Sequence, residues 1–310
     1  MTQLTLRDGT AVLPFAFGAM QFGGTADETA SRAMFDACRA AGIAHFDTAY
    51  AYTDGASERM LGAFAAPERD RLYIATKVNY PGGGGRANIL SSFEESRKRL
   101  GMDTVDLLYM HRWTGDTPLE ETFETLAELQ TKGQVRHIGV SNYAAWQVMK
   151  AQAVAARLGT RIDVVQPMYN LVKRQAEVEI LPMCASEGIV AATYSPLGGG
   201  LLTGKYGRGG SGRLKDNAMY AKRYGVQSMY DSAAALADLA AELGTEPATL
   251  AVAWVARHPA HPNPILSARS AEQLRPSLDA LRFRMDEALH ARIAGLSATP
   301  PPATDRLEEA

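Results

Sequence analysis

Four side chains suited to moving a proton occur at Asp47, Tyr52, Lys77 and His111. A free phenol has a pKa of roughly 10, so it donates a proton poorly near neutral pH, and an adjacent ammonium lowers that value. Lys77 would supply this charge to Tyr52, and Asp47 would keep Lys77 protonated and in place. His111 could donate a hydrogen bond to the oxygen that receives the proton. The set therefore predicts proton transfer to an oxygen atom of a small molecule.

Each of the four residues also has an ordinary structural role open to it. Asp47 could cap a helix, and Lys77 could be a solvated charge. His111 could be a hydrogen-bonded loop histidine, and Tyr52 could be a packing aromatic. The chemical interpretation becomes the better one only if the fold brings the four side chains together.

Short apolar runs typical of buried β-strands recur along the chain at nearly even spacing. They cover about 14–18, 43–48, 72–77, 105–110, 135–140, 162–167, 189–194 and, with a weaker apolar character, 263–268. The first seven begin about 30 residues apart, which is the length of one strand, one crossover helix and two loops. Because the runs are almost continuously apolar, we expect strands buried on both faces of a parallel sheet.

Helix patterns alternate with these strands. They cover 27–41, 57–65, 87–100, 118–132, 144–158, 173–187, 231–243, 246–258, 271–282 and 285–296. The helix over 87–100 ends in three basic residues with Gly101 just beyond, which suits the negative end of a helix dipole and a left-handed cap. Eight such units favour a closed (β/α)8 TIM barrel over a doubly wound open sheet, although spacing does not give the strand order.

Three segments stand outside the repeating units. Residues 3–13 read as two short strands joined by Asp8-Gly9, a dipeptide that favours a tight hairpin. Residues 198–230 form a long Gly-rich, basic loop insertion after the seventh strand, and loops of that length are usually functional or disordered. We expect one domain over 1–310, with a mobile tail at about 298–310.

The composition of the chain indicates which kinds of partner the protein can bind. The chain has 310 residues, 46% of them hydrophobic and 21% charged, with a formal net charge of −2. This balance suits a globular core and gives no basic field for nucleic acid or anionic lipid. The only cysteines, Cys38 and Cys184, lack metal-ligand spacing and read as buried apolar residues. With no run of about 18 apolar residues, we expect a cytoplasmic protein without a membrane span or a metal.

Polar residues gather where the predicted strands end. Beyond the four already described, they are Ser141 and Asn142 after the fifth strand, Gln166 in the sixth, and Tyr194 and Ser195 at the seventh. In a closed parallel barrel these carboxyl ends meet at one rim, which is where active sites are built.

Several segments of the sequence resemble those of a known family. The segments GIAHFDTAYAYTDGASERMLG (42–62), YMHRW (109–113), GQVRHIGVSN (133–142) and YSPLGGGLLTGKY (194–206), with Lys77 at its expected place, resemble the aldo-keto reductase superfamily. The resemblance covers most of the chain. It implies a (β/α)8 barrel that reduces aldehydes or ketones with NADPH, or sometimes NADH, without a metal.

The resemblance also implies residue roles. Tyr52 would be the general acid, Lys77 and Asp47 its tuning pair, and His111 the residue that orients the carbonyl. Asn142 and Gln166 would bind the nicotinamide carboxamide with Ser141 beside them, although Gln166 could instead be an internally satisfied strand amide. Tyr194 would stack on the nicotinamide ring, and the backbone of Ser195, Pro196 and Leu197 would approach the pyrophosphate.

The segment ILSARSAEQLRPSL (265–278) resembles the family's adenosine-binding motif. Arg269 and Gln273 fit that motif, whereas Ser267 replaces its usual Gly and Ser277 its usual Asn. A planar, always charged guanidinium suits a phosphate dianion, so Arg269 favours NADPH over NADH. A helix-capping or surface role for Arg269 is the alternative.

Two glycine runs imitate nucleotide-binding signatures. GGLLTGKY (199–206) nearly matches a P-loop, but Tyr206 stands where a small hydroxyl must coordinate Mg²⁺. GRGGSG (207–212) matches a dinucleotide fingerprint in letters but lies inside a loop and not at a strand-to-helix turn. We expect both runs to form a mobile loop that closes over the cofactor.

The predicted function is NADPH-dependent reduction of an aldehyde or ketone, by a monomer or weak homo-oligomer that binds a small carbonyl substrate. Trp113 and Tyr80 are expected to wall the substrate pocket, with a plain core role as the alternative for Trp113. Two other functions stay open. One is a nicotinamide-sensing binding or regulatory protein, resembling the potassium-channel β-subunits that share this fold, and the other is a Schiff-base aldolase using Lys77. No group of residues names the carbonyl substrate.

Overall fold

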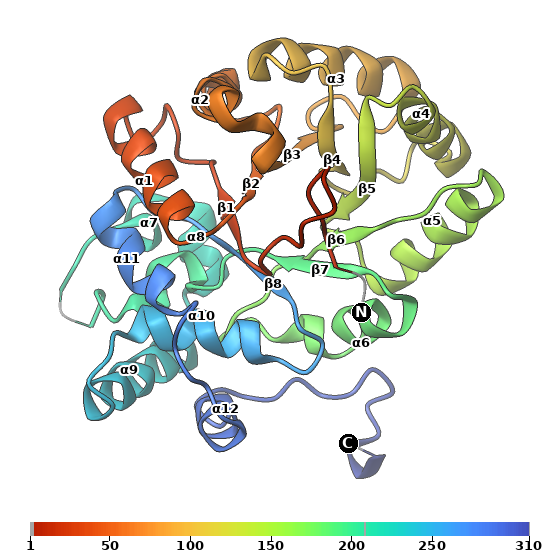
Figure 1. The fold of residues 1–310 in the computed structure, drawn as a ribbon. Coiled ribbons are helices and arrows are strands. Elements are labelled where there is room, and N and C mark those ends of the chain that lie inside the picture. The colour runs from red at the N-terminus through yellow and green to blue at the C-terminus, as the bar shows by residue number, and fades with distance from the viewer. Residues whose placement is uncertain (1–2, 208, 310) are drawn as a thin grey trace.

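Eight parallel strands close into a barrel in the computed structural model, which describes residues 3–207 and 209–309 (Figure 1). The strands are β1 (Ala16–Gly18), β2 (His45–Asp47), β3 (Tyr73–Val78), β4 (Val105–Met110), β5 (Val135–Ser141), β6 (Val164–Gln166), β7 (Val190–Thr193) and β8 (Asn263–Leu266). Each strand pairs with the next along the chain. β1 also pairs with β8, with Ala16 opposite Ile265 and Phe17 opposite Leu266. This closure confirms the (β/α)8 barrel and excludes the open sheet.

Alternate strand residues serve two separate layers of the core, as the two-residue period of a strand requires. Tyr73, Leu107 and Val164 belong to the smaller apolar cluster, which the barrel strands share with the N-terminal segment. Ile74 and Leu108 belong to the larger cluster, which joins the strands to the surrounding helices. Both faces of the sheet are therefore buried, which explains the continuous apolar runs in the sequence.

Helices surround the barrel in Figure 1. They are α1 (Glu28–Ala40), α2 (Ala56–Ala65), α3 (Arg86–Leu100), α4 (Leu119–Thr131), α5 (Ala145–Arg157), α6 (Ile180–Glu187), α9 (Gln227–Glu242), α10 (Pro247–Arg257), α11 (Ala271–Asp279) and α12 (Glu287–Ala294). Gly101 ends α3 in the left-handed conformation, with φ of 62°, as predicted. Cys38 and Cys184 are both free and buried.

The helix predicted over 173–187 was wrong at its start. A short 3₁₀ turn covers Gln175–Glu177, and α6 begins only at Ile180. Pro182 explains the difference: it lacks an N–H and is tolerated in the first turn of a helix but not in its interior. A helix starting at 173 would have placed Pro182 in the interior.

The insertion after β7 is not one long loop. It contains a 3₁₀ turn over Gly198–Thr203, then α7 (Arg213–Asp216) and α8 (Ala218–Tyr224), and α9 starts within its last residues. The side chain of Asn217 caps α8 by accepting hydrogen bonds from the backbone of Met219 and Tyr220, at 3.0 and 3.3 Å. The described part of 198–230 is therefore largely helical.

The N-terminal hairpin is present and closes one end of the barrel. From residue 3 onward, its two arms meet at a single antiparallel bridge, Thr5 to Ala11, and do not extend into a longer ladder. Leu4, Leu6 and Val12 pack into the smaller apolar cluster of the barrel strands, and the hairpin crosses the middle of the view in Figure 1. Arg136 at the start of β5 donates to the backbone oxygen of Thr5, at 2.6 Å. The hairpin thus covers the amino end of the strands and leaves the carboxyl end open.

Within 3–207 and 209–309, no helix is long and apolar enough to cross a membrane. The single domain over 1–310 and the mobility of the tail at 298–310 stay predictions.

Candidate active site

A cavity of about 800 Å³ opens at the carboxyl ends of the strands. Gly18, Asp47, Ser141, Gln166 and Leu266, which end five of the strands, all line it. Most of the predicted site residues share this lining: Asp47, Tyr52, Tyr80, His111, Ser141, Asn142, Gln166, Tyr194, Ser195, Pro196, Leu197, Arg269 and Gln273. The barrel has therefore brought together residues spread over more than two thirds of the chain.

Lys77 does not line the cavity but lies buried beneath it. Its ammonium forms an ion pair with Asp47, whose carboxylate oxygen Oδ1 accepts from Nζ, and it donates to the backbone oxygen of Thr48 at 2.8 Å. A third contact, at 3.4 Å, reaches the hydroxyl of Tyr52. Burial, the largest single effect, lowers the pKa of Lys77, but the charges and hydrogen bonds of Asp47 and Tyr52 together outweigh it and leave the pKa above its usual value. Lys77 is thus a fixed cation directed at Tyr52.

The pKa of Tyr52 lies above its usual value, which corrects the expectation that Lys77 lowers it overall. Burial raises the pKa most, and the Lys77 ammonium opposes that effect only in part. The charge of Asp47 raises it further. Residue types cannot reveal the burial, which is why the sequence predicted the opposite sign. The phenol of Tyr52 is therefore protonated at neutral pH and has a cation ready to stabilise the phenolate.

His111 lies beside Tyr52 in the lining of the cavity, with the two rings edge to face and their centroids 5.7 Å apart. Burial, with the nearby charges of Lys77 and Arg112, lowers the pKa of His111 to about 3. The imidazole is accordingly neutral, and a neutral imidazole carries one N–H that can donate to a substrate oxygen. The geometry places this donor and the Tyr52 hydroxyl at the same part of the cavity.

A chain of hydrogen bonds links the predicted nicotinamide contacts to the catalytic set. Tyr194 donates from its hydroxyl to Oδ1 of Asn142 at 2.7 Å, and Asn142 donates to Oγ of Ser141 at 3.1 Å. Ser141 donates to the backbone oxygen of Gln166, also at 3.1 Å. Gln166 in turn donates from Nε2 to Oδ2 of Asp47 at 2.9 Å. Gln166 is therefore compatible with both predicted roles. Its amide is hydrogen-bonded inside the protein, as a strand amide would be, and its place in the cavity lining leaves it within reach of a nicotinamide.

The other end of the cavity is rich in positive charge. Lys205 and Arg213 from the insertion line it together with Arg269, and burial and these two arginines lower the pKa of Lys205. Gly199 lines it with φ of 65°, and a Cβ there would lie 2.8 Å from the ring of Tyr220. The buried hydroxyl of Ser267, also in the lining, has no hydrogen-bond partner among the residues that the structure describes. Three cations, a close backbone approach and an unpaired donor suit a dinucleotide phosphate.

Sequence reasoning missed several lining residues: Met20, Arg112, Lys205, Arg213, Tyr220 and Arg223. The sequence points to two of them, because Arg112 directly follows His111 and Lys205 lies in the segment that nearly matches a P-loop. It does not point to Tyr220 and Arg223, because their place depends on where α8 lies.

Trp113 lies outside the lining of the cavity and is only half-buried. Its ring meets those of Tyr143 and Trp146 edge to face, with centroids 5.1 and 5.7 Å apart. Trp113 is therefore not a wall of this cavity but a half-buried residue packed against the larger apolar cluster, whereas Tyr80 does line the cavity.

No group of three or more His, Cys, Asp or Glu side chains is placed to hold a metal ion anywhere in 3–207 or 209–309.

Known proteins match almost the whole chain. The sequence model of the Aldo/keto reductase family matches residues 14–298. A "Probable voltage-gated potassium channel subunit beta" of Oryza sativa subsp. japonica is 34% identical over 292 residues, which cover 89% of each chain. The "Uncharacterized oxidoreductase YrpG" of Bacillus subtilis is 33% identical over 303 residues, 91% of each chain. "Norsolorinic acid reductase B" of Dothistroma septosporum is 31% identical over 312 residues, 92% of this chain and 78% of its own.

Proposed function

Because the chain belongs to the aldo/keto reductase family, we propose that it reduces the carbonyl group of an aldehyde or ketone to an alcohol, with NADPH as its cofactor. Family membership and relatives named as oxidoreductases support oxidoreductase activity in general. Beyond this general activity, we propose that the protein prefers NADPH, that its site residues have the roles given below, and that it is a cytoplasmic monomer or weak homo-oligomer.

The observation that carries this proposal is the contact of Tyr52 with Lys77 at the base of the cavity, 3.4 Å between hydroxyl and ammonium. A phenol held against a buried cation can lose its proton to a substrate oxygen, because the cation stabilises the phenolate that remains. His111, neutral and beside Tyr52 in the cavity, would donate a hydrogen bond to the same oxygen and orient the carbonyl. The donor pair thus stabilises negative charge where it develops.

The residues present fit a bound nicotinamide dinucleotide. When bound, the reduced nicotinamide supplies the hydride. Ser141, Asn142 and Gln166 would hold the carboxamide, and Tyr194 would stack against the ring. Ser195, Pro196, Leu197 and Lys205 would approach the pyrophosphate, while Arg269 and Gln273 would hold the adenosine end.

A matched pair of tyrosine variants tests the acid. Tyr52→Phe should lower kcat for reduction of 4-nitrobenzaldehyde by at least about a hundredfold, because it removes the proton that Tyr52 delivers. Tyr50→Phe makes the same change in a neighbouring tyrosine outside the cavity lining and should keep wild-type kcat. Turnover is followed by loss of NADPH absorbance, in a regime where the chemical step limits the rate. Wild-type kcat in Tyr52→Phe would remove Tyr52 from the mechanism.

Nucleotide preference has its own test. Tryptophan fluorescence titrations with NADPH and NADH should show tighter binding of NADPH, and Arg269→Ala should weaken NADPH binding about tenfold while changing NADH binding little. A calorimetric titration checks for binding without a fluorescence change. Equal loss for both nucleotides would show that Arg269 does not contact a 2′-phosphate.

The similarity to proteins named as channel β-subunits keeps a second function in view, a nicotinamide-sensing regulatory protein. Tight NADPH binding without turnover of any tested carbonyl would favour it. The geometry disfavours the Schiff-base aldolase, because Lys77 is buried, paired with Asp47 and held protonated by a raised pKa. Borohydride trapping of a substrate on Lys77 would reverse that conclusion.

A further inference from the structure

Arg112 lies in the substrate part of the cavity and has no role in the proposed mechanism. It directly follows His111, lines the same cavity and has an exposed side chain. Its guanidinium carbon lies 4.1 Å from the centroid of the Tyr80 ring, which also lines the cavity. Arg112 is therefore a cation at the end of the cavity where the carbonyl would react.

The protein fixes Arg112 in place from its backbone. The buried side chain of Asn79 accepts from the backbone N–H of His111 at 2.6 Å and of Arg112 at 3.3 Å. Its amide donates back to the carbonyl oxygen of Arg112 at 2.8 Å. The Tyr80 ring, on which Arg112 stacks, also meets the His111 ring edge to face, with centroids 5.8 Å apart. The same contacts that hold the imidazole thus hold the guanidinium beside it.

Within the described residues the charge of Arg112 has no counter-ion. Among residues 3–207 and 209–309, no carboxylate forms an ion pair with its guanidinium, and the guanidinium donates no hydrogen bond. The acid on this side of the cavity, Asp47, already accepts from Lys77 and Gln166. Stacking on Tyr80 covers a face of the planar group and leaves its N–H edges open, and those edges match an oxyanion in two parallel hydrogen bonds.

We propose that Arg112 binds an oxyanion group carried by the carbonyl substrate, so that the preferred substrates are aldehydes or ketones bearing a carboxylate or a phosphate. This inference rests on the proposed function and names the substrate class of the same cavity. Arg112 binds the distant oxyanion, while Tyr52 and His111 act on the carbonyl oxygen.

Matched aldehydes test the proposal. The probes are 4-carboxybenzaldehyde, 4-formylphenyl phosphate and the neutral methyl 4-formylbenzoate. We expect Arg112→Met to lower the ratio of kcat/KM for an anionic probe to kcat/KM for the neutral ester about tenfold. Comparing the ratio between variants cancels the electronic effect of each substituent on the carbonyl. The phosphate and carboxylate probes show which oxyanion Arg112 prefers.

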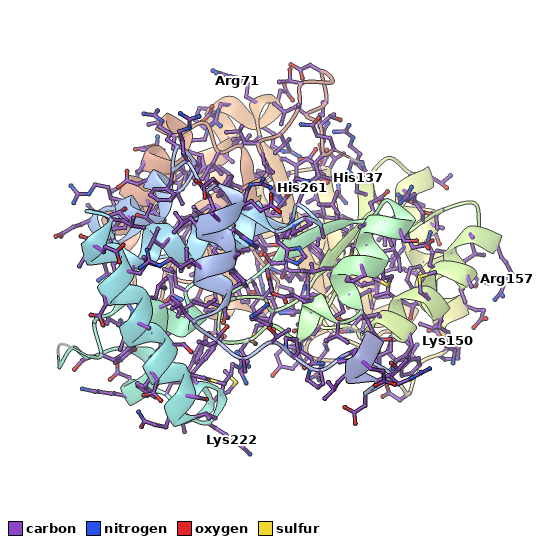
Figure 2. All side chains as sticks on the ribbon, turned by 90° about the horizontal axis from the view of Figure 1, so that it is seen from below. Arg71, His137, Lys150, Arg157, Lys222 and His261 are labelled. Carbon is purple, nitrogen blue, oxygen red and sulfur yellow. The ribbon has the colours of Figure 1, made fainter. Side chains whose placement is uncertain are left out.

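Two further variants complete the design. Arg112→Lys keeps the charge without the planar fork and should retain an intermediate ratio. Arg157→Met removes the same charge from α5, where Figure 2 shows Arg157 projecting from the outer edge of the molecule, and should keep the wild-type ratio. An unchanged ratio in Arg112→Met, or an equal fall in Arg157→Met, would overturn the proposal.

Failure of the Arg112 site can be distinguished from failure of the proposed reductase function. If the wild-type protein reduces none of the aldehydes, the reductase proposal fails, and calorimetry with 4-(hydroxymethyl)benzoate still decides the Arg112 site. Arg112→Met should weaken binding of that carboxylate about tenfold and leave the neutral 4-(hydroxymethyl)benzamide unaffected. Equal binding of the carboxylate to both proteins, or no binding to the wild type, overturns the site.

Discussion

Gln166 donates from Nε2 to Oδ2 of Asp47 at 2.9 Å, while the other oxygen of the same carboxylate accepts from Lys77. One buried acid is therefore held between a predicted nicotinamide contact and the cation that faces Tyr52. Because both contacts share a single carboxylate, a change at Gln166 should reach the catalytic set as well as the cofactor site.

Gln166→Leu tests this coupling. The variant leaves Oδ2 of Asp47 without its donor in a buried place, so we expect kcat to fall about tenfold and the dissociation constant of NADPH to rise. Gln273→Leu, at the adenosine end, should change the dissociation constant far more than kcat. Both are measured by steady-state kinetics and fluorescence titration. A Gln166→Leu protein with weaker binding but full kcat would limit Gln166 to cofactor contact.

The pH dependence of kcat/KM should show no change caused by protonation of a histidine. Reduction needs the protonated form of Tyr52, whose pKa lies above its usual value of 10.0, so activity should be lost only as pH rises above about 10. The pKa of His111 is lowered to about 3, so the imidazole stays neutral throughout the range of the assay. We expect kcat/KM at saturating NADPH to stay flat from about pH 5 to about pH 9. A limb near pH 6.5 that disappears in His111→Gln would contradict the burial of His111.

His45 should make the fold sensitive to acid. Burial, aided by the charge of Lys77, lowers its pKa from 6.5 to about 3 in the folded chain. Between these values the unfolded chain binds a proton that the folded chain does not, so the free energy of unfolding falls as pH falls. One such histidine contributes a slope of at most about 1.4 kcal/mol per pH unit.

Denaturant titrations between pH 4.5 and 6.5 should show this slope reduced in His45→Asn. The control is His261→Asn, since the side chain of His261 is exposed. An unchanged slope in His45→Asn would mean that His45 is protonated in the folded state.

Gly62 should tolerate no side chain. A Cβ there would lie 2.2 Å from the backbone oxygen of Leu100, so α2 and α3 could not keep their spacing. We expect Gly62→Ala to lower the free energy of unfolding by about 3 kcal/mol. Gly295→Ala, whose nearest neighbour would be 3.5 Å away, is the control and should be nearly neutral in denaturant titrations. Wild-type stability in Gly62→Ala would show that the helices can move apart.

The strands and the catalytic set could be predicted because their signals are local. Ser141 ends its strand and Lys77 is the last residue but one of its own, and the even spacing of the apolar runs predicted the barrel. The contact of Gln166 with Asp47 could not be predicted, because it joins residues 119 positions apart and exists only once the barrel closes. The sign of the Tyr52 pKa shift depends on burial, which residue types do not reveal.

The insertion after β7 escaped prediction for another reason. Its helices α7 and α8 are too short to be stable alone, and a glycine-rich stretch precedes α7. Buried Leu214, Tyr220 and Tyr224 hold them against the rest of the protein. Such packing has no periodic signature in the sequence, and so the basic residues that these helices bring to the cavity also stayed hidden.

The pairing of β1 with β8 sets a condition on how the chain is made. A ribosome releases β1, which ends at Gly18, long before its second partner β8, which begins at Asn263, and a strand without its partner exposes unpaired backbone groups. Until β8 is made, the nascent barrel is thus an open sheet with two free edges, a form prone to association with other chains. Protein shortened before β8 should collect in aggregates, whereas loss of residues after 298 leaves the ring of strands complete.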